Sequence, residues 1–494
     1  MVKIFLGICI GFFSLNLTTS VLKSHLEIGT DSDLLYPASL IEDVVQNQPI
    51  LWNLPPSPNF FPDIFLFGIF RILTGNTFYA YYFHSFIFAL LLWYSFYIMF
   101  GNLFFSFLMI TGILLFFTFL PDKFGIFFFP GYHGTIFILL PILYFFLFEK
   151  ANPNFISPRT KIYLYTLFCL VLSSDSHSFS QFLIPAFFSY LTLCLFRKSR
   201  FYIPLYLILF TCLSFLVVHA IKYIKIFRIP DVPIVSATKA VIQNKLLLTN
   251  LQKGLNLFWN DRFGFGENAI YFYLWLFLGL LTLGLLLVIF IKSKGKKEDR
   301  KLLFTNQEWL LVLFFLYSTL ISLGIQFILG VWMGSRYVWA MYLFPFIIFP
   351  LLLNKWKEND LLLYVHCGFL VLLYFMLPAY QSIYKQFPIN KDVRCVLEYA
   401  IQKKAVFGIS NYWYAKYLTL ASANQLKMYQ ITENLETYHW INNTIPFRNV
   451  VYNLVISNDL PEDAIFKKWK IPDEKFHCGK IRLLYYQNGI QYFD

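Results

Sequence analysis

Residues 269–291 read AIYFYLWLFLGLLTLGLLLVIFI, a run of 23 residues that contains no charged side chain. A helix crosses the bilayer core with about 20 apolar residues, so this run is long enough to span a membrane. Ten further stretches have a similar character. The candidate spans are 4–22, 77–100, 103–121, 135–148, 162–174, 181–196, 201–221, 269–291, 309–331, 338–353 and 361–380. The expected fold is therefore a polytopic α-helical membrane protein with about 11 transmembrane helices.

The composition of the 494 residues agrees with a membrane protein. Hydrophobic residues make up 58% of the chain and charged residues only 14%. Soluble globular proteins carry roughly 25% charged residues, so the composition argues against a soluble enzyme and against a disordered chain. The formal net charge of +13 would suit a nucleic-acid binder, but its distribution along the chain has another explanation.

Lysine and arginine are enriched in the loops that would be cytoplasmic if the N-terminus is inside. These loops hold 15 of the 40 basic residues, whereas the much longer outer loops before residue 381 hold 11. Cytoplasmic loops of membrane proteins are enriched in basic residues. The sequence therefore predicts an N-in, C-out orientation, and it gives no reason to expect nucleic acid as a partner.

Residues 1–22 have a second interpretation, as a secretory signal peptide with Lys3, an apolar core and small residues at 18–20. No A-x-A-like cleavage site is present, which favours a retained span. The remaining topology is the same in both cases.

Residues 381–494 differ in character from the membrane part, residues 1–380. Alternating apolar residues predict strands at 449–457 and 480–487, and 412–421 is predicted to be a helix. Cys395 and Cys478 are the cysteines of this tail, one near each end. In an oxidising compartment such a pair is expected to form a disulfide, and two free thiols are the alternative. We expect a small α/β domain on the outer face.

Acids, histidines and isolated basic residues near membrane ends collect on the predicted outer face. Such residues are costly in lipid and tend to mark functional sites. The set comprises Asp31, Asp33 and Asp63 in the first outer loop, Asp122, Lys123 and His133 in the second, Asp175 and His177 in the third, Asp261, Arg262 and Glu267 in the fourth, and Arg336 in the fifth. A polar site shared by five outer loops explains this concentration.

The first outer loop, 23–76, carries the richest pattern. Asp33 is placed to cap a helix whose apolar stripe is Leu34, Ala38, Ile41 and Val45, with Glu42, Asp43 and Gln46 on the opposite face. Such a helix would lie in the membrane interface, apolar side down. A second short apolar stretch, 64–73, is predicted to be a juxtamembrane or re-entrant helix. Asp31 and Asp33 would then lie at the water–lipid boundary.

These features resemble the GT-C superfamily of polytopic glycosyltransferases, which take sugars from polyprenyl- or dolichyl-phosphate carriers. The likeness rests on the N-in first span, the early acidic pair Asp31-Ser32-Asp33, the late Ser335-Arg336-Tyr337 segment and an outer C-terminal domain. The segments 52–63 and 411–415 also resemble bacterial proteins of this general type. The WWD-like tripeptide of oligosaccharyltransferases is not present, which argues against en bloc transfer to asparagine.

The resemblance implies roles for the acidic pair and for Arg336, and the positions of the other candidate residues suggest theirs. Asp31 or Asp33 would be the catalytic base, and Arg336 would bind the carrier phosphate, assisted by Arg262 or Lys123. Asp63, Asp175, His177 and His133 would bind sugar, pyrophosphate or a divalent cation such as Mg²⁺ or Mn²⁺. A hydrated turn also explains Asp175 and His177, and a simple turn before a span explains His133 better than ligand recognition does. Expected partners are a polyprenyl-phosphate-linked donor, membrane lipids and a glycan, lipid or protein acceptor. Expected localisation is the bacterial cytoplasmic membrane, with residues 381–494 in the periplasm.

Two other classes of protein are weighed against an inverting transferase. A flippase or transporter of lipid-linked glycans needs polar residues at mid-membrane depth, but the acids avoid the span centres. A non-catalytic scaffold would recruit a partner through its C-terminal domain. The chain has no Walker loop, G-x-S-x-G, C-x-x-C or H-E-x-x-H motif, so ATP-driven transport, serine hydrolysis and zinc proteolysis lack support.

Overall fold

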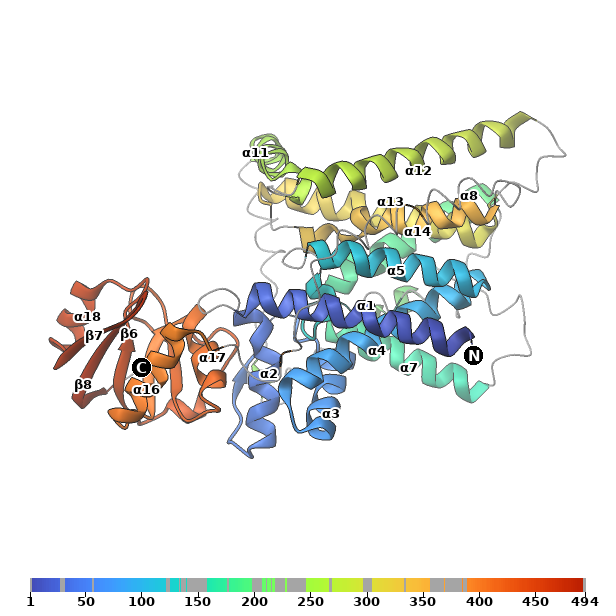
Figure 1. Cartoon of the computed structure of the whole chain (residues 1–494). Coiled ribbons are helices and arrows are strands. Elements are labelled where there is room, and N and C mark those ends of the chain that lie inside the picture. Colours follow the sequence, from blue (N-terminus) through green and yellow to red (C-terminus); the bar gives the residue numbers. More distant parts are fainter. Residues whose placement is uncertain are drawn as a thin grey trace.

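The computed structural model of the chain describes residues 2–26, 32–55, 57–120, 125–132, 134, 139, 158–175, 177–197, 207–209, 211–214, 216–217, 227–228, 246–265, 269–295, 304–332, 335–355, 368, 384 and 389–491. Helices make up most of the chain, and a small sheet region follows at the C-terminal end (Figure 1). The spans predicted at 135–148, 201–221 and 361–380 lie mostly outside the described residues.

Five helical segments in the described residues are long and apolar enough to cross a membrane: Val2–His25, Thr77–Ile98, Phe179–Phe196, Ile270–Ile289 and Glu308–Leu329. Three shorter apolar helices, Leu103–Phe119, Ile162–Ser174 and Trp339–Leu353, coincide with further predicted spans. The prediction of a helical membrane protein is therefore confirmed in its class, by the length and composition of these helices.

Local sequence explains where two neighbouring helices meet. Helix α4 (Thr77–Phe100) begins after Asn76, whose side-chain oxygen accepts two backbone amide groups of the first turn. It ends at Gly101, which has a φ of 64° and so avoids the steric penalty of a side chain in the left-handed region. Asn102 then caps α5 (Leu103–Phe119) in the same manner. Two residues thus suffice to reverse the chain.

The apolar helices pack into one bundle. Helix α1 (Val2–His25) contacts α4 and α5, while α13 (Asn306–Leu329) packs on α8 (Ile184–Arg197). Helix α14 (Trp339–Lys355) contacts α5, α12 (Ala269–Gly295) and α13. Helix α7 (Pro158–Ser174) lies beside this group (Figure 1). The buried core of the bundle is rich in phenylalanine, in agreement with the 60 phenylalanine residues of the chain.

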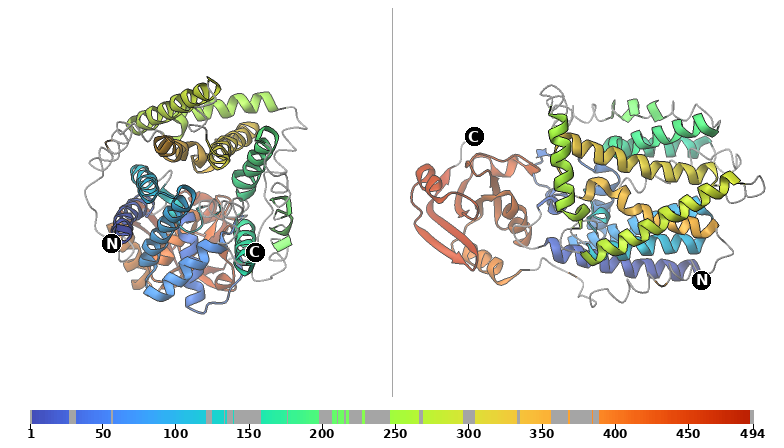
Figure 2. Two further views of the ribbon diagram at one scale, coloured as in Figure 1. Left: turned by 90° about the vertical axis from the view of Figure 1, so that its right-hand side faces the viewer. Right: turned by 90° about the horizontal axis from the view of Figure 1, so that it is seen from above.

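Helices at one end of the bundle run crosswise to the others. Helix α2 (Ser32–Val45) crosses the end of α1 in Figure 1. Helix α11 (Leu247–Asn260) crosses the end of α12 in Figures 1 and 2. The C-terminal region lies at this same end, and the N-terminus lies at the other (Figures 1 and 2). The predicted first and fourth outer loops and the tail therefore share one end of the molecule.

Glu42 of α2 corrects one sequence expectation. The helical pattern predicts it on the polar, water-facing side, but it is buried, whereas Val45 of the predicted apolar stripe is exposed. The reason is Arg71 of α3 (Phe65–Thr74), whose Nε and Nη2 donate to the two Glu42 oxygens at 2.6 and 3.1 Å. Thr77 also donates to Glu42 at 2.6 Å. The short helix predicted at 64–73 thus anchors α2.

We expect Arg71→Met to lower the free energy of unfolding by about 3 kcal/mol or more, because it leaves the Glu42 carboxylate buried and without its cation. Thermal unfolding in detergent measures the change. The double variant Glu42→Gln/Arg71→Met serves as the control and should recover part of the loss. Equal stability of Arg71→Met and the unmodified chain would contradict this interpretation.

The C-terminal region is built on a five-stranded sheet with strand order β4-β3-β6-β8-β7. The strands are β3 (Phe407–Asn411), β4 (Lys427–Ile431), β6 (Val451–Ile456), β7 (Glu474–Cys478) and β8 (Ile481–Gln491). Strands β4 and β6 run parallel to β3, and β7 and β8 complete an antiparallel half. Helices α16 (Lys391–Gln402), α17 (Tyr412–Ala421) and α18 (Glu462–Trp469) accompany the sheet. The predicted strands and helix of the tail are confirmed.

A second, very small sheet joins this region to the first loop. Strand β1 (Trp52–Asn53) pairs with β5 (Asn442–Asn443) in antiparallel and with β2 (Phe227–Arg228) in parallel fashion. Next to it, Asn443 Oδ1 accepts the Leu51 amide at 3.1 Å. Segments separated by almost 400 residues are therefore held together by backbone pairing.

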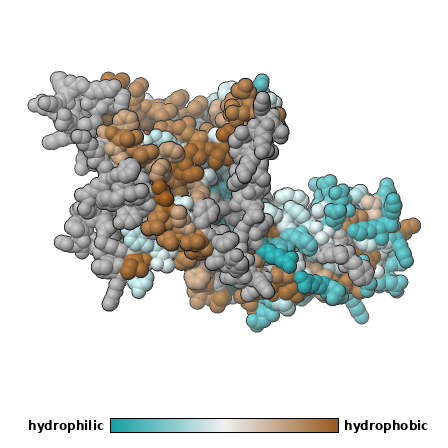
Figure 3. All heavy atoms as spheres, turned by 180° about the vertical axis from the view of Figure 1, so that it is seen from behind, coloured by the Kyte–Doolittle hydropathy of each residue, from teal (hydrophilic) through white to brown (hydrophobic). Residues whose placement is uncertain are grey.

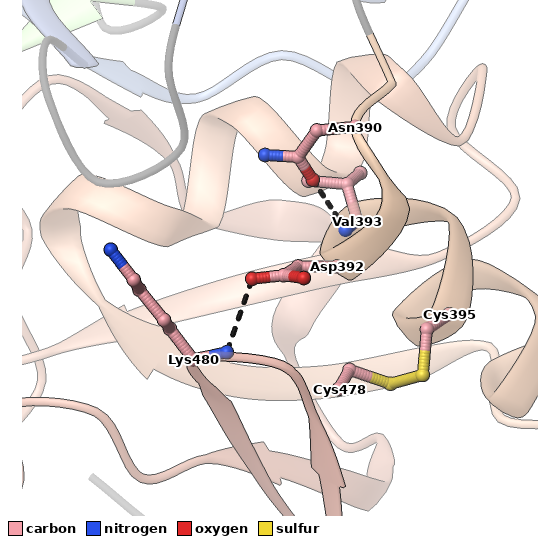
Figure 4. The surroundings of a disulfide bond; sticks show 6 residues. All are labelled: Asn390, Asp392, Val393, Cys395, Cys478 and Lys480. Carbon is pink, nitrogen blue, oxygen red and sulfur yellow. Dashed lines mark hydrogen bonds between the residues drawn. A yellow bond between two sulfur atoms is a disulfide. The ribbon is translucent and has the colours of Figure 1, made fainter.

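Cys395 and Cys478 form a disulfide that ties the start of α16 to the end of β7, the pairing expected from the sequence (Figure 4). Beside it, Asn390 caps α16 by accepting the Val393 amide at 2.8 Å. Asp392 of the first turn accepts the Lys480 amide at 3.1 Å. The β7–β8 turn is thus joined to α16 by a covalent bond and a hydrogen bond.

The surface of the molecule changes from one part to the other. Viewed from behind, the described part of the helical bundle shows mostly hydrophobic residues, whereas the C-terminal region is largely hydrophilic (Figure 3). Exposed leucine, isoleucine and phenylalanine side chains also occur on α1, α8 and α12. This difference between the two surfaces is what we expect if the helical bundle contacts lipid and the C-terminal region contacts water.

Candidate active site

A set of polar residues at the C-terminal-region end of the bundle is linked by direct contacts, and we call it the polar network. It draws on six separate segments of the chain. Its members are Asp33, Tyr36, Asn59, Asp63, Gly131, Ser174, Asp175, His177, Gln181, Tyr337 and Tyr412. Asp31, Lys123 and His133 lie outside the described residues.

Asp33 lies in the first turn of α2 and contacts the C-terminal region. The Tyr412 hydroxyl donates a hydrogen bond to Asp33 Oδ1. The neighbouring Ser32 hydroxyl donates to the Tyr412 carbonyl oxygen at 2.7 Å. Tyr412 itself is fixed as the first residue of α17, where Asn411 caps the helix. The candidate base is therefore held by a residue almost 380 positions away in sequence.

Tyr36, one helical turn after Asp33, is the point at which three acids converge. Its side chain is 2% exposed, and its hydroxyl donates to the Pro58 carbonyl oxygen at 2.8 Å. Burial raises the pKa of Tyr36 well above its usual value, and the negative charges of Asp63, Asp33 and Asp175 raise it further. These acids come from three segments, so they share one electrostatic environment.

Asp63 and Asn59 form the buried centre of the polar network. Asp63 Oδ2 accepts the Gly131 amide at 3.3 Å, and Asn59 Nδ2 donates to the Gly131 carbonyl at 3.2 Å. Among the residues that the structure describes, Asp63 Oδ1 and Asn59 Oδ1 are both buried without a hydrogen-bond partner. Burial raises the pKa of Asp63 well above its usual value, and the charge of Asp175 adds to this. These two buried oxygens thus keep unused hydrogen-bond acceptor capacity.

The third predicted outer loop joins this centre through Ser174. Its carbonyl oxygen accepts the Asn59 amide at 2.9 Å, and its hydroxyl accepts the Phe61 amide at 2.8 Å. The next residue, Asp175, is fully buried and accepts the His177 amide at 2.9 Å. Ser174, next to Asp175, therefore packs directly on the first outer loop.

The fifth predicted outer loop reaches the same place through Tyr337. The His177 ring lies 5.1 Å from the Tyr337 ring, centroid to centroid, and Gln181 Nε2 donates to the Tyr337 carbonyl at 3.4 Å. Tyr337 belongs to a short turn, Ser335–Val338, that also contains Arg336. The backbone of Arg336 is thus placed beside the Asp175 turn, while its side chain lies outside the described residues.

Arg262 does not join the polar network within the described residues. It is exposed at the end of α11, and both Arg262 and Phe263 have positive φ angles, 45° and 57°. The preceding Asp261 accepts the Trp332 indole N–H at 2.7 Å, three residues before Ser335. Arg262 therefore lies near the start of the fifth loop rather than at the buried acids.

The side chains Tyr36, Asn59, Ser174 and Tyr412 have no role that the sequence pattern predicts. Asn59 and Tyr412 lie in the two segments noted for their resemblance to other bacterial proteins, but that pattern carries no function. Tyr36 looks like part of an apolar helix face, and Ser174 like an ordinary turn residue. Only the packing of distant segments brings Tyr412 into contact with Asp33 and sets Tyr36, Asn59 and Ser174 in the same buried region as the other acids.

The described residues contain no group of three or more histidine, cysteine, aspartate and glutamate side chains that could hold a metal ion. The open oxygens of Asp63 and Asn59 are nevertheless of the type that Mg²⁺ and Mn²⁺ prefer. A cation here would take two ligands from those residues, with Asp175 as the nearby second carboxylate.

No protein-family model, no curated protein and no solved structure matches this chain. A proposed function must therefore rest on the chemistry of the residues in this chain.

We expect Asp63→Asn to stabilise the protein at pH 8 by about 1 kcal/mol or more. The pKa of Asp63 is raised above its ordinary 3.8, so the native state favours the protonated form and stability falls as the pH rises from 4 through the raised pKa. Asparagine at position 63 still offers an oxygen that accepts the Gly131 amide. It has no ionisable proton, so this contribution to the pH dependence of stability is lost. Thermal unfolding between pH 4 and pH 8 measures it, and identical pH profiles for both proteins would contradict the assignment.

Proposed function

We propose that this chain is a membrane glycosyltransferase of the GT-C type. It moves a sugar from a polyprenyl-phosphate-type carrier to an acceptor on the outer, periplasmic face, with inversion at the anomeric carbon. The observation that supports this most is the convergence of Asp33, Asp63 and Asp175 on Tyr36 at the end of the bundle that the C-terminal region covers. The enrichment of basic residues in the predicted cytoplasmic loops supports the N-in orientation, and the proposed count of eleven spans rests on the apolar runs of the sequence.

In the proposed reaction, Asp33 or Asp31 accepts the proton of an acceptor hydroxyl as its oxygen attacks the anomeric carbon. The new bond joins that oxygen to the sugar, and the bond between the sugar and the carrier phosphate breaks. The electron pair leaves with the phosphate, so the products are the glycosylated acceptor, the free carrier phosphate and a protonated aspartate. Tyr412 orients the Asp33 carboxylate through its hydrogen bond.

Arg336 is proposed to bind the carrier phosphate. A guanidinium group matches phosphate geometry and stays charged at all physiological pH values. The contact between His177 and Tyr337 supports this role, because it sets the Arg336 backbone next to the acid-bearing turn. Arg262 and Lys123 would add positive charge at the edge of the site, and His133 and His177 would contact the sugar.

The proposed cofactor is Mg²⁺ or Mn²⁺, held by Asp63, Asn59 and Asp175. The cation would neutralise charge on the donor phosphate. If so, EDTA should lower the rate of transfer by about 10-fold or more, and Mg²⁺ or Mn²⁺ should restore it. The rate in chelated, dialysed nanodiscs measures this effect, and an unchanged rate would contradict the cation.

A reconstituted assay tests the function. The full chain in nanodiscs is incubated with a panel of polyprenyl-phosphate sugars, and free polyprenyl phosphate is measured. We expect one donor to be consumed by the unmodified chain and by Glu433→Gln, an exposed acid of the C-terminal region. Translocation of an intact lipid-linked glycan would instead indicate a transporter. Neither cleavage nor translocation with any donor would favour a scaffold.

A further inference from the structure

A small pocket opens between α2 of the first loop and the C-terminal region, and we call it the junction pocket. Its volume is about 50 Å³, and its walls come from α2, β1, α17, β4 and β5. The side chains that matter here are Asp43, Lys416, Lys427 and Asn442. None of them belongs to the polar network, although Lys416 contacts the ring of Tyr412, which does.

Lys416 gives the pocket a buried positive charge. Its side chain is 5% exposed, which is rare for lysine. The ammonium group donates to Gln430 Oε1 at 3.3 Å and lies 4.1 Å from the centre of the Tyr412 ring. Contact with an aromatic face stabilises a cation that has left water. The ammonium is thus fixed in the pocket wall.

Asn442 supplies a hydrogen-bond donor without an acceptor in the described part of the chain. Its side chain is 9% exposed, and its Nδ2 is buried with no partner there. A buried polar group left in this state costs about 1–3 kcal/mol, so a water or ligand that accepts its hydrogen bond would stabilise it. Lys427 lies on the same pocket and donates a hydrogen bond to Gln48 Oε1 at 3.1 Å. An ammonium group has three N–H donors, so the bond to Gln48 leaves Lys427 able to donate to a ligand as well.

The balance of charge selects the ligand. Asp43 Oδ2 already accepts the Trp52 indole N–H at 2.9 Å and the Asn443 amide at 2.8 Å. Among the described lining residues, Lys416 and Lys427 therefore exceed Asp43 by one positive charge. A carboxylate carries one negative charge and neutralises this excess, whereas a phosphate monoester carries about −1.5 to −2 at neutral pH and would leave uncompensated negative charge in a partly buried site.

The size of the pocket limits what enters it. Pockets for whole small molecules measure roughly 300–1,000 Å³, so about 50 Å³ accommodates one acid group and a few waters. The rest of the ligand would extend out of the pocket, whose lining also includes Ser39 and Asn424. We propose that the junction pocket binds the carboxylate of a small hydroxylated acid, such as a hexuronate residue of a saccharide. This inference does not depend on the transferase reaction.

A ligand-observed NMR titration of glucuronate with the full chain in nanodiscs tests the proposal, because it measures the dissociation constant. We expect a dissociation constant in the millimolar range for glucuronate. Glucose, which lacks the carboxylate, should bind about 10-fold more weakly or worse, because a charge-assisted hydrogen bond is lost. Inorganic phosphate should also bind more weakly than glucuronate. Equal affinity for glucose, tighter binding of phosphate or no binding of glucuronate would overturn the proposal.

Variants locate the site. Lys427 is partly exposed, so Lys427→Met should weaken glucuronate binding about 10-fold without disturbing the hydrophobic core of the C-terminal region. Asn442→Leu should weaken it as well, and Lys416→Met most strongly if that variant folds. Lys467→Met, an exposed lysine on α18, is the matched control and should bind as the unmodified chain does. Unchanged affinity in Lys427→Met would contradict the assignment.

Discussion

Asp33→Asn is expected to lower the rate of sugar transfer by about 10²–10⁴-fold, the usual contribution of a general base. Asparagine fills the same space and can still accept the hydrogen bond from Tyr412, but it cannot take up a proton. Insertion in the membrane and thermal stability should stay close to those of the unmodified chain. The release of polyprenyl phosphate in nanodiscs measures the rate.

Asp31→Asn and the double variant complete this experiment, because either aspartate of the pair can be the base. Tyr412→Phe is the matched test of orientation: it keeps the ring beside Lys416 and removes only the hydroxyl. We expect it to lower kcat about 10-fold and leave KM unchanged, as the loss of one hydrogen bond to a charged group implies. Full activity in all three aspartate variants would end the assignment.

The second large effect concerns the disulfide. Replacement of both Cys395 and Cys478 by serine should lower the free energy of unfolding of the C-terminal region by about 4 kcal/mol. The cysteines are 83 residues apart, and a bond that closes a long loop strongly restricts the unfolded chain. Denaturant unfolding, with limited proteolysis of residues 389–491, measures the loss.

The reductant control separates this effect from local packing. Dithiothreitol should destabilise the unmodified chain and leave the Cys395→Ser/Cys478→Ser variant unchanged. Mass mapping under non-reducing conditions adds a test of location, since such a bond persists in an oxidising compartment. Two free thiols would contradict both the stabilisation and the outer placement of the tail.

The sequence predicts the helices and the tail well because both depend on local patterns. Charge-free runs such as 269–291 form helices wherever the structure describes them, and alternation at 449–457 marks β6. Cys395 and Cys478 are paired as expected because the tail contains just these two cysteines. In each case the information lies within one short segment or in a simple count.

Contacts between distant segments could not be predicted. Glu42 has the pattern of a solvent-facing residue until Arg71 is seen beside it, and Asp33 gives no hint of Tyr412. The two-residue strands β1, β2 and β5 have no sequence pattern at all. Asp63 and Asp175 can each be identified singly, but their shared burial around Tyr36 depends on how the loops pack. Such features arise from tertiary packing, which local propensity does not encode.

An experimental structure of Asp33→Asn with a non-transferable polyprenyl-phosphate sugar analogue tests the central claim most directly. We predict the phosphate next to Arg336 and the sugar between residue 33 and the Asp63–Asp175 pair, with the carrier chain in the lipid. Analogue bound at the opposite end of the bundle, or a sugar out of reach of residue 33, would contradict the account.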